Sequence, residues 1–454
     1  MLVITFGYIL LGLFIWAIEC ARIRKYGPDL FTLFILLLAI QMVFPGIILT
    51  AAMDLSRGGF DTGVPFINRV LNDVGLYEAL LVLVLLCLFV LSLYFTWFWV
   101  HSQVNLQRSC VPKIRIYVSR WRWFFVMLIG LTGMWVLLKE LGNYNNLVLF
   151  RIDSSHLNRN FVTANLFSLT TTFMTLAVVG LMMFWEKKIS AKFLFSLTSA
   201  SVFALMTVSR RAFGIIILLV LFTLILAKKR FYITKIIVPT ALIYVPIIIF
   251  GKKVLWLLSQ NADVGISTTI AVHGGLFSGL LLFVANIGTP TIESWAALLY
   301  LDIPMRFGVD HLLSIARRIP DGILGLDIDF PERIVRISTE AFVGPGRQDI
   351  PPGLVGQMWL DYGFLGPIFW GIAFGLVISF LQVLYNRTEK DPAAVSLFAI
   401  AVYTAGLPIN SGTFDFVFSV NVIFLVIFIF FIIKIKRINQ RWIPVENNPR
   451  NYRP

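Results

Sequence analysis

Two adjacent arginines, Arg210 and Arg211, interrupt an apolar stretch that runs from Phe193 to Ala227. An arginine side chain cannot lose its proton to escape an apolar environment, so its charge in such a stretch needs an anionic partner. Phosphate and pyrophosphate groups suit the planar guanidinium, which binds two oxygens at once. We therefore predict that Arg210 and Arg211 bind a pyrophosphate group at a membrane surface. In the alternative interpretation, they only reach lipid phosphates at the interface.

A short helix is predicted over residues 330–342. Asp329 is suited to cap its first turn, Pro331 is accepted within that turn, and Glu332 occupies the third position of a capping box. Gly344 is typical of a helix end. We therefore expect one helical unit whose faces follow from the spacing of its residues.

One face of this helix and the loop after it carry charged residues: Arg333, Arg336, Glu340, Arg347 and Asp349. We predict that the three arginines of this set bind the same pyrophosphate or its glycan, together with the arginine pair described above. In this interpretation the helix is a lid, in which Arg336 and Glu340 face the membrane helices while Ile334 and Ile337 pack elsewhere. A water-exposed face with local ion pairs is the alternative.

The composition predicts a membrane protein. Apolar residues make up 58% of the chain and charged residues only 14%, so the chain cannot cover a soluble globule with polar surface. Runs of about 17 to 25 apolar residues are long enough to cross a bilayer as helices. We expect an all-α, polytopic membrane helix bundle with about 11 transmembrane helices, near residues 2–19, 30–52, 79–100, 121–138, 163–185, 193–208, 212–227, 231–250, 364–385, 393–409 and 414–433.

Clusters of lysine and arginine alternate with these runs, and short cytoplasmic loops are enriched in both residues. The clusters lie near residues 22–25, 108–122, 187–192, 228–235, 387–390 and 434–453. If these clusters are cytoplasmic, the N-terminus and the turn with Arg210 lie outside and the C-terminus lies inside. The same assignment gives transmembrane helices 1–8 in residues 1–250, an external loop in 251–352, and helices 9–11 with a basic cytoplasmic tail in 353–454.

The external loop is too long to be a simple connection, and we expect it to contain short helices. Its apolar stretch over residues 277–300 is broken by Asn286, Gly288 and Pro290. This pattern favours a re-entrant or interfacial pair of helices packed on the bundle over a continuous span.

The net charge of +14 is explained by the cytoplasmic loops and does not indicate nucleic-acid binding. Three cysteines and four histidines lack the spacing of a disulfide framework or a metal site, so we predict no metal and no cofactor. The sequence has no phosphate-binding loop motif of the kind found in ATP-driven pumps. The energy for a reaction must therefore lie in the substrate.

Two short motifs resemble those of a known family. The run Pro351-Pro352-Gly353-Leu354-Val355-Gly356, followed by Tyr362-Gly363-Phe364-Leu365-Gly366, resembles the segment that introduces a late helix in bacterial O-antigen and related repeat-unit polymerases. Ser209-Arg210-Arg211-Ala212 resembles the turn between two middle helices of those proteins. The helix order and the placement of the large external loop are also similar to the family's.

The resemblance implies a GT-C-type membrane glycosyltransferase that polymerises undecaprenyl-pyrophosphate-linked oligosaccharides for cell-surface polysaccharide or lipopolysaccharide. It also implies the bacterial inner membrane as location, a periplasmic N-terminus, a cytoplasmic C-terminus, membrane lipids around the helices and a chain-length regulator protein as partner. In such a reaction the arginines stabilise the leaving pyrophosphate. Glu340, Asp349 and His311 are the candidates for the base that deprotonates the attacking hydroxyl.

Two other functions share some of these features. A flippase or another transporter of lipid-linked oligosaccharides would place polar groups on broken helices at mid-membrane and would show internal repeats. In this sequence most charge gathers at one face and no convincing repeat is found between the halves, which favours surface chemistry. A ligase that moves finished polymer onto a lipid A core would share the fold and the arginines, so this alternative stays open.

A cysteine placed at Ser209 is expected to react with an impermeant thiol reagent added to intact cells. The basic clusters at Lys188 and Lys229 require two crossings between them, which places the intervening turn outside. Lys188→Cys is the matched control and should react only after permeabilisation. The reverse labelling pattern would overturn the topology.

Overall fold

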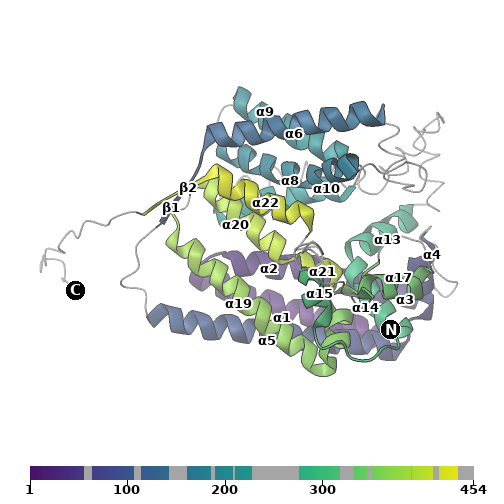
Figure 1. The fold of residues 1–454 in the computed structure, drawn as a ribbon. Coiled ribbons are helices and arrows are strands. Elements are labelled where there is room, and N and C mark those ends of the chain that lie inside the picture. The colour runs from purple at the N-terminus through teal and green to yellow at the C-terminus, as the bar shows by residue number, and fades with distance from the viewer. Residues whose placement is uncertain are drawn as a thin grey trace, which may run out of the picture.

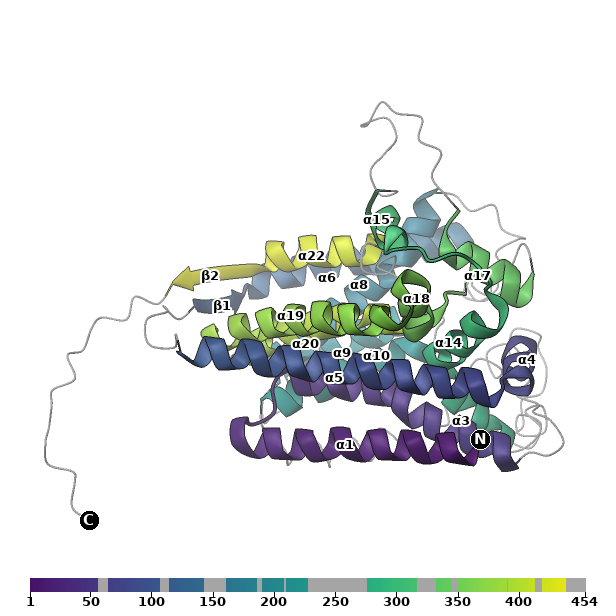
Figure 2. The ribbon, with the colours of Figure 1, turned by 90° about the horizontal axis from the view of Figure 1, so that it is seen from below.

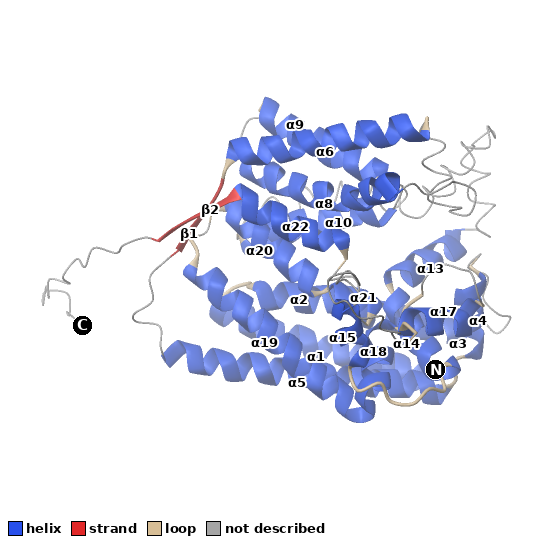
Figure 3. Cartoon of the chain, viewed as in Figure 1, coloured by secondary structure: helices blue, strands red, loops and turns tan. Residues whose placement is uncertain are grey.

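The computed structural model describes residues 1–55, 64–106, 114–142, 161–185, 190–207, 210–227, 276–316, 332–344, 350–389, 391–412 and 419–437. These residues are almost entirely helical, as Figure 3 shows, and the only sheet among them has two strands. The prediction of an all-α membrane bundle is therefore confirmed, apart from this small sheet.

Within the described residues, six helical segments are long and apolar enough to cross a bilayer. They are Leu2–Tyr26, Leu30–Asp54, Leu76–Gln103, Arg120–Leu141, Gly353–Arg387 and Pro392–Ser411. The first is α1 (Leu2–Tyr26), the third lies in α5 (Leu76–Leu106), and the fourth is α6 (Arg120–Leu141). The others are composite: α2 (Leu30–Leu38), η1 (Ala39–Val43) and α3 (Phe44–Leu55); α18 (Gly353–Tyr362), η2 (Gly363–Leu365) and α19 (Gly366–Arg387); α20 (Pro392–Ala405) and α21 (Leu407–Ser411). The chain is thus a multi-pass membrane protein.

Four further apolar helices coincide with predicted spans, but their described apolar parts are shorter than the six above. They are α8 (Phe161–Met183), α9 (Ala191–Met206), α10 (Arg210–Leu226) and α22 (Val420–Ile432). The remaining predicted span, 231–250, lies outside the described residues.

The bundle has two distinct ends, which Figures 1 and 2 show from two directions. At one end, here the strand end, β1 (Ile114–Val118) pairs antiparallel with β2 (Ile433–Arg437). The other end, here the cap end, holds the N-terminus and the short helices α4 (Pro65–Asp73), α13 (Leu276–Ile287), α14 (Thr289–Tyr300), α15 (Val309–Ala316) and α17 (Ile334–Val343).

The sheet at the strand end was not predicted. Its strands read Ile-Arg-Ile-Tyr-Val and Ile-Lys-Ile-Lys-Arg, an alternation typical of strands. From their lysine and arginine content, both segments had been predicted to lie in basic loops. The sheet joins two distant parts of the chain, because β1 leads into α6 and β2 follows α22.

The end of α9 and the start of α10 lie at the cap end. Trp123, in the first turn of α6 near the sheet, contacts Phe184 at the end of α8 and Phe195 at the start of α9, with ring centroids 5.5 Å and 6.1 Å apart. Helix α9 therefore starts near the strand end and runs away from it. Since α10 begins only four residues after α9 ends, Arg210 lies at the opposite end.

Two glycines allow α18 to pack closely on α14. A side chain at Gly356 would meet the Cβ of Ala297 at 2.7 Å, and Gly353 has a φ of +70° with the backbone and side chain of Ser294 close by. Both glycines therefore have a packing role. Gly288 likewise separates α13 from α14, so the predicted break within residues 277–300 is also confirmed.

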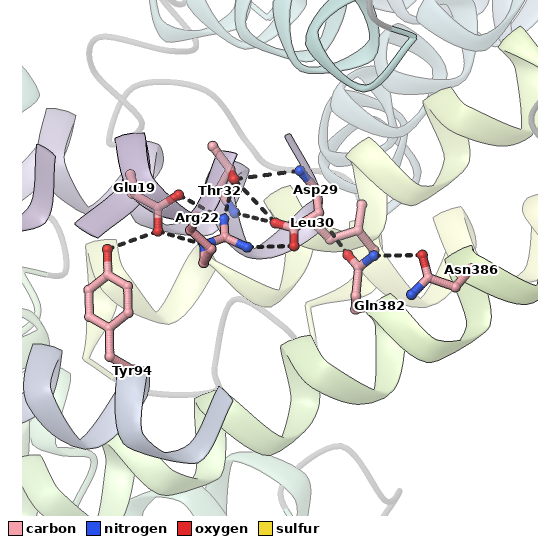
Figure 4. A network of polar contacts seen from close by, with 8 residues as sticks. All are labelled: Glu19, Arg22, Asp29, Leu30, Thr32, Tyr94, Gln382 and Asn386. Carbon is pink, nitrogen blue, oxygen red and sulfur yellow. Dashed lines mark hydrogen bonds and ion pairs between the residues drawn. The ribbon is translucent and has the colours of Figure 1, made fainter. Parts of the chain in front are cut away.

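A buried network of charged groups joins three helical segments near the strand end, as Figure 4 shows. The guanidinium of Arg22, 1% exposed, donates to Glu19 at 2.7 Å and 3.0 Å and to Asp29 at 2.5 Å. It also donates to the hydroxyl of Thr32, and Tyr94 donates to Glu19 at 2.9 Å. The network therefore holds α1 against α2 and α5.

We expect Arg22→Met to destabilise the protein by about 3–5 kcal/mol, because Glu19 and Asp29 would stay buried without their counter-charge. Arg24→Met is the matched control, since Arg24 is exposed two residues away. The measurement is thermal unfolding of the purified protein in detergent. Equal unfolding temperatures for the Arg22 and Arg24 variants would show that the network does not stabilise the bundle.

Candidate functional site

A cluster of polar side chains lies at the cap end, where α15, α18 and the start of α19 meet (Figure 2). Its members are connected by hydrogen bonds and are buried or nearly so: Arg306, Asp310, His311, Gln357, Asp361 and Trp370. Such groups are costly to bury in a membrane protein unless each is paired, and such clusters are a default candidate for a functional site.

Backbone hydrogen bonds place the two halves of the cluster together. The amide of Arg306 donates to the carbonyl of Leu360 at 2.8 Å, and the amide of Phe307 donates to the carbonyl of Asp361 at 3.0 Å. Gly308 then turns the chain with a φ of +73°, which favours glycine, and α15 begins at Val309. The end of α18 thus positions the start of α15, and His311 with it.

Asp361 is the centre of the cluster. Its carboxylate is fully buried and accepts three hydrogen bonds, from His311 Nε2 at 2.9 Å, Gln357 Nε2 at 2.9 Å and Trp370 Nε1 at 3.1 Å. Three N–H donors compensate much of the cost of burying a carboxylate. They also fix its orientation, because the donors come from three different helices.

His311 is held on two sides by these contacts. Since a carboxylate oxygen accepts, Nε2 carries the hydrogen of the His311–Asp361 bond, and in the neutral ring Nδ1 then carries the lone pair. The indole of Trp370 packs against the imidazole, with ring centroids 4.3 Å apart. The ring is therefore oriented by a carboxylate and by an aromatic side chain.

A second ion pair adjoins the first. Arg306 donates to Asp310 through Nε at 2.9 Å and through Nη2 at 2.6 Å, and Gln357 links Asp310 to Asp361 with a longer contact of 3.5 Å. The hydrogen bonds to Asp310 raise the pKa of Arg306 above its ordinary value. The cluster thus combines two carboxylates with one permanent cation and one histidine.

This arrangement suits general base catalysis. A neutral imidazole whose one nitrogen donates to a buried carboxylate accepts a proton on its other nitrogen, and the carboxylate stabilises the imidazolium that forms. Among the described residues, no group of three or more His, Cys, Asp or Glu side chains is placed to hold a metal ion.

Of the three candidate bases from the sequence, His311 belongs to this cluster. Glu340 does not: it is exposed on α17 and forms an ion pair with Arg336 at 3.2 Å. Asp349 lies outside the described residues, as does Arg347. The catalytic role of each stays a prediction.

The predicted orientation of the 330–342 helix is wrong. Arg336 is 68% exposed and bonded to Glu332 and Glu340, whereas Ile334 is buried against Leu360. Burying the apolar face of a short helix is favourable, whereas burying its charges would be costly. The solvated face of ion pairs, which was the alternative interpretation, describes Arg336 and Glu340.

The predicted start of this helix also differs. It begins at Ile334, with the exposed Arg333 in the preceding cap position and no side-chain cap bond. Residues 329–331, which carry most of the predicted capping box, lie outside the described residues. The predicted end at Gly344 is confirmed, with a φ of +88°.

Arg210 and Arg211 begin α10 at the cap end. Their backbone positions are described, and their side chains lie outside the described part of the chain. The pyrophosphate role of both arginines therefore stays a prediction.

Sequence reasoning missed five members of the cluster: Arg306, Asp310, Gln357, Asp361 and Trp370. A signal was present for two of them, because Gln357 and Asp361 are four residues apart in an otherwise apolar run and so share one helix face. A carboxylate in such a run needs a partner, but the sequence does not indicate which.

No family model, no curated protein and no solved structure matches this chain.

We expect Asp361→Ala to destabilise the protein, because the N–H groups of His311, Gln357 and Trp370 would lose their acceptor, at a cost of about 1–3 kcal/mol for each group left unsatisfied. Asp361→Asn should cost less, since the amide oxygen still accepts. Asp302→Ala, at an exposed carboxylate outside the cluster, is the control. If all three variants unfold at the same temperature in detergent, Asp361 does not organise the cluster.

Proposed function

We propose that this protein is a polymerase of lipid-linked oligosaccharide repeat units in the synthesis of a cell-surface polysaccharide. In this proposal it is a glycosyltransferase that uses undecaprenyl-pyrophosphate-linked glycans and transfers the growing chain to the next unit. The O-antigen polymerase resemblance of the 209–212 and 351–366 motifs supports the class. The oriented His311–Asp361 pair is the observation that carries the chemistry.

The location of the pair supports the proposal. His311 and Asp361 lie at the same end of the bundle as the turn before α10, where Arg210 and Arg211 begin the helix. A base and fixed cations at one membrane surface are the two elements that transfer from a pyrophosphate to a hydroxyl requires.

In the proposed reaction, the oxygen of the acceptor hydroxyl forms a bond to the anomeric carbon of the donor glycan. The bond from that carbon to the pyrophosphate oxygen breaks, and its electron pair leaves with undecaprenyl pyrophosphate. The hydroxyl proton passes to Nδ1 of His311, and Asp361 stabilises the imidazolium through Nε2. Arg210 and Arg211 stabilise the charge that develops on the leaving group.

The proposal includes movement at the cap end. The imidazole of His311 is only 7% exposed, so an acceptor hydroxyl reaches it after the covering elements shift. Arg306 Nη2 donates to the carbonyl of Glu332 at 3.3 Å, just before α17, and this contact can open without loss of the Asp361 hydrogen bonds. Opening of α17 as a lid would admit two bulky lipid-linked glycans.

We further propose eleven transmembrane helices, with the cap end and the N-terminus periplasmic and the C-terminus in the cytoplasm of a bacterium. The basic strands β1 and β2 at the strand end support this orientation, because Lys and Arg are enriched in cytoplasmic loops. Membrane lipids and a chain-length regulator protein are the proposed partners.

Cells that lack this gene are expected to accumulate single repeat units on the acceptor, and the wild-type gene should restore a ladder of longer glycans. His311→Gln should reduce chain extension by about 10²–10⁴-fold, because the amide can still donate to Asp361 but cannot serve as a base. Arg210→Ala and Arg211→Ala should also shorten the ladder, and lysine at either position should restore it only in part. The glycans are measured by gel electrophoresis at equal protein level.

Lys139→Ala is the control for the arginines, since Lys139 is an exposed cation near the end of α6. His101→Gln, at a histidine stacked on Trp97 near the strand end, is the control for His311. In cells that lack the gene, polymer that forms but stays unattached would indicate a ligase. Repeat units trapped on the cytoplasmic side of those cells would indicate a flippase. A wild-type ladder in the His311 variant would refute its role as base.

A further inference from the structure

The segment from Met305 to Leu312 has its polarity reversed. Its charged and ionisable side chains point inward, with Asp310 4% and His311 6% exposed and Arg306 bonded to Asp310. Its large apolar side chains point outward, with Phe307 65% and Leu312 67% exposed. In water, the opposite arrangement would be favoured, because apolar area is buried and charges are solvated.

The backbone holds this reversed arrangement in place. Phe307 has a φ of +49°, which is rare for a residue other than glycine and costs conformational energy. Its amide donates to the backbone carbonyl of Asp361, and its carbonyl accepts from the hydroxyl of Tyr362 at 3.1 Å. The ring of Phe307 is therefore directed outward by a turn that hydrogen bonds hold in place.

The outward face continues onto a transmembrane segment. The ring of Tyr362 contacts Phe307 and Phe369, with centroids 6.3 Å and 5.2 Å away. Phe369 belongs to the exposed apolar side of α19, which lies within the span Gly353–Arg387, and this side also carries Ile372, Leu376 and Phe380. Leu365, which ends η2 just before α19, is exposed as well. The exposed apolar side chains of the span thus continue through Tyr362 to the turn at Phe307.

The neighbouring helix α17 has ordinary polarity. Its Arg336 and Glu340 are exposed, whereas Ile334 and Phe342 are buried. Two segments at the same end of the bundle therefore expose side chains of opposite polarity.

We propose that Met305, Phe307, Val309 and Leu312, together with the start of α19, form a lipid-docking surface. Its partners are the acyl chains of the adjacent membrane leaflet, into which α15 is inserted with its apolar side outward. Burial in acyl chains removes the cost of exposing these side chains to water. The buried cluster around His311 and Asp361 then lies on the inner side of this lipid-docking surface. If the proposed function also holds, a lipid-borne substrate reaches His311 from this side.

The proposal is tested with nitroxide spin labels on the full chain, in which Cys20, Cys87 and Cys110 are replaced by serine. Phe307→Cys and Leu312→Cys are labelled separately in vesicles of phosphatidylethanolamine and phosphatidylglycerol. Collision rates with oxygen, which enters the acyl region, are compared with those of a water-soluble nickel chelate. Both positions should collide more with oxygen than with nickel.

Two matched controls define the scale. Phe380→Cys, on the exposed apolar side of α19, should give the lipid pattern, and Arg336→Cys, similarly exposed on α17, should favour nickel. Collision mainly with nickel at both Phe307 and Leu312 would overturn the proposal, because the surface would face water. Low collision with both reagents would also overturn it, because protein would cover the surface. The measurement needs no glycan transfer, so its outcome is independent of the proposed function.

Discussion

The carboxylate of Asp361 is buried inside an apolar bundle, and its charge must be balanced by groups brought to it. Three N–H donors do this, and each comes from a different helix: α15, α18 and α19. The need for these donors therefore determines where α15 lies. His311 can donate to Asp361 only if the turn before α15 is hydrogen-bonded to the end of α18. The same contacts that satisfy a buried charge also orient an imidazole, so stability and potential chemistry depend on one residue.

At the strand end, too, a buried charge is balanced by groups from neighbouring helices, but there the central charge is positive. Arg22 is surrounded by Glu19 and Asp29 and packs against the rings of Phe31 and Trp97, at 5.0 Å and 4.6 Å from the ring centroids. Helices in a membrane gain little from burying apolar surface against one another, because lipid is equally apolar. Close glycine contacts, as between α14 and α18, and paired charges therefore specify which helices are neighbours.

The cap end combines two elements that differ in their surroundings. On α17 the charged side chains are exposed, while around Phe307 they are turned toward Asp361 and the apolar side chains are outside. A pinned turn with a positive φ maintains the second arrangement. This combination places the polar cluster between a water-facing helix and an apolar outer surface, which is a suitable location for chemistry on a substrate that has both a lipid and a polar part.

The membrane class, the positions of the long apolar helices and the break at Gly288 all followed from the sequence. These features depend on local run length, hydropathy and backbone freedom, which neighbouring residues determine. The partners of the charged groups were decided only by the tertiary structure. Asp361 and His311 are separated by 50 positions, and the face that α17 buries depends on Leu360. Burial and pairing depend on segments that are distant in the chain. His311 was therefore a candidate base from its residue type and its place in the external segment, but the carboxylate that orients it was not identified.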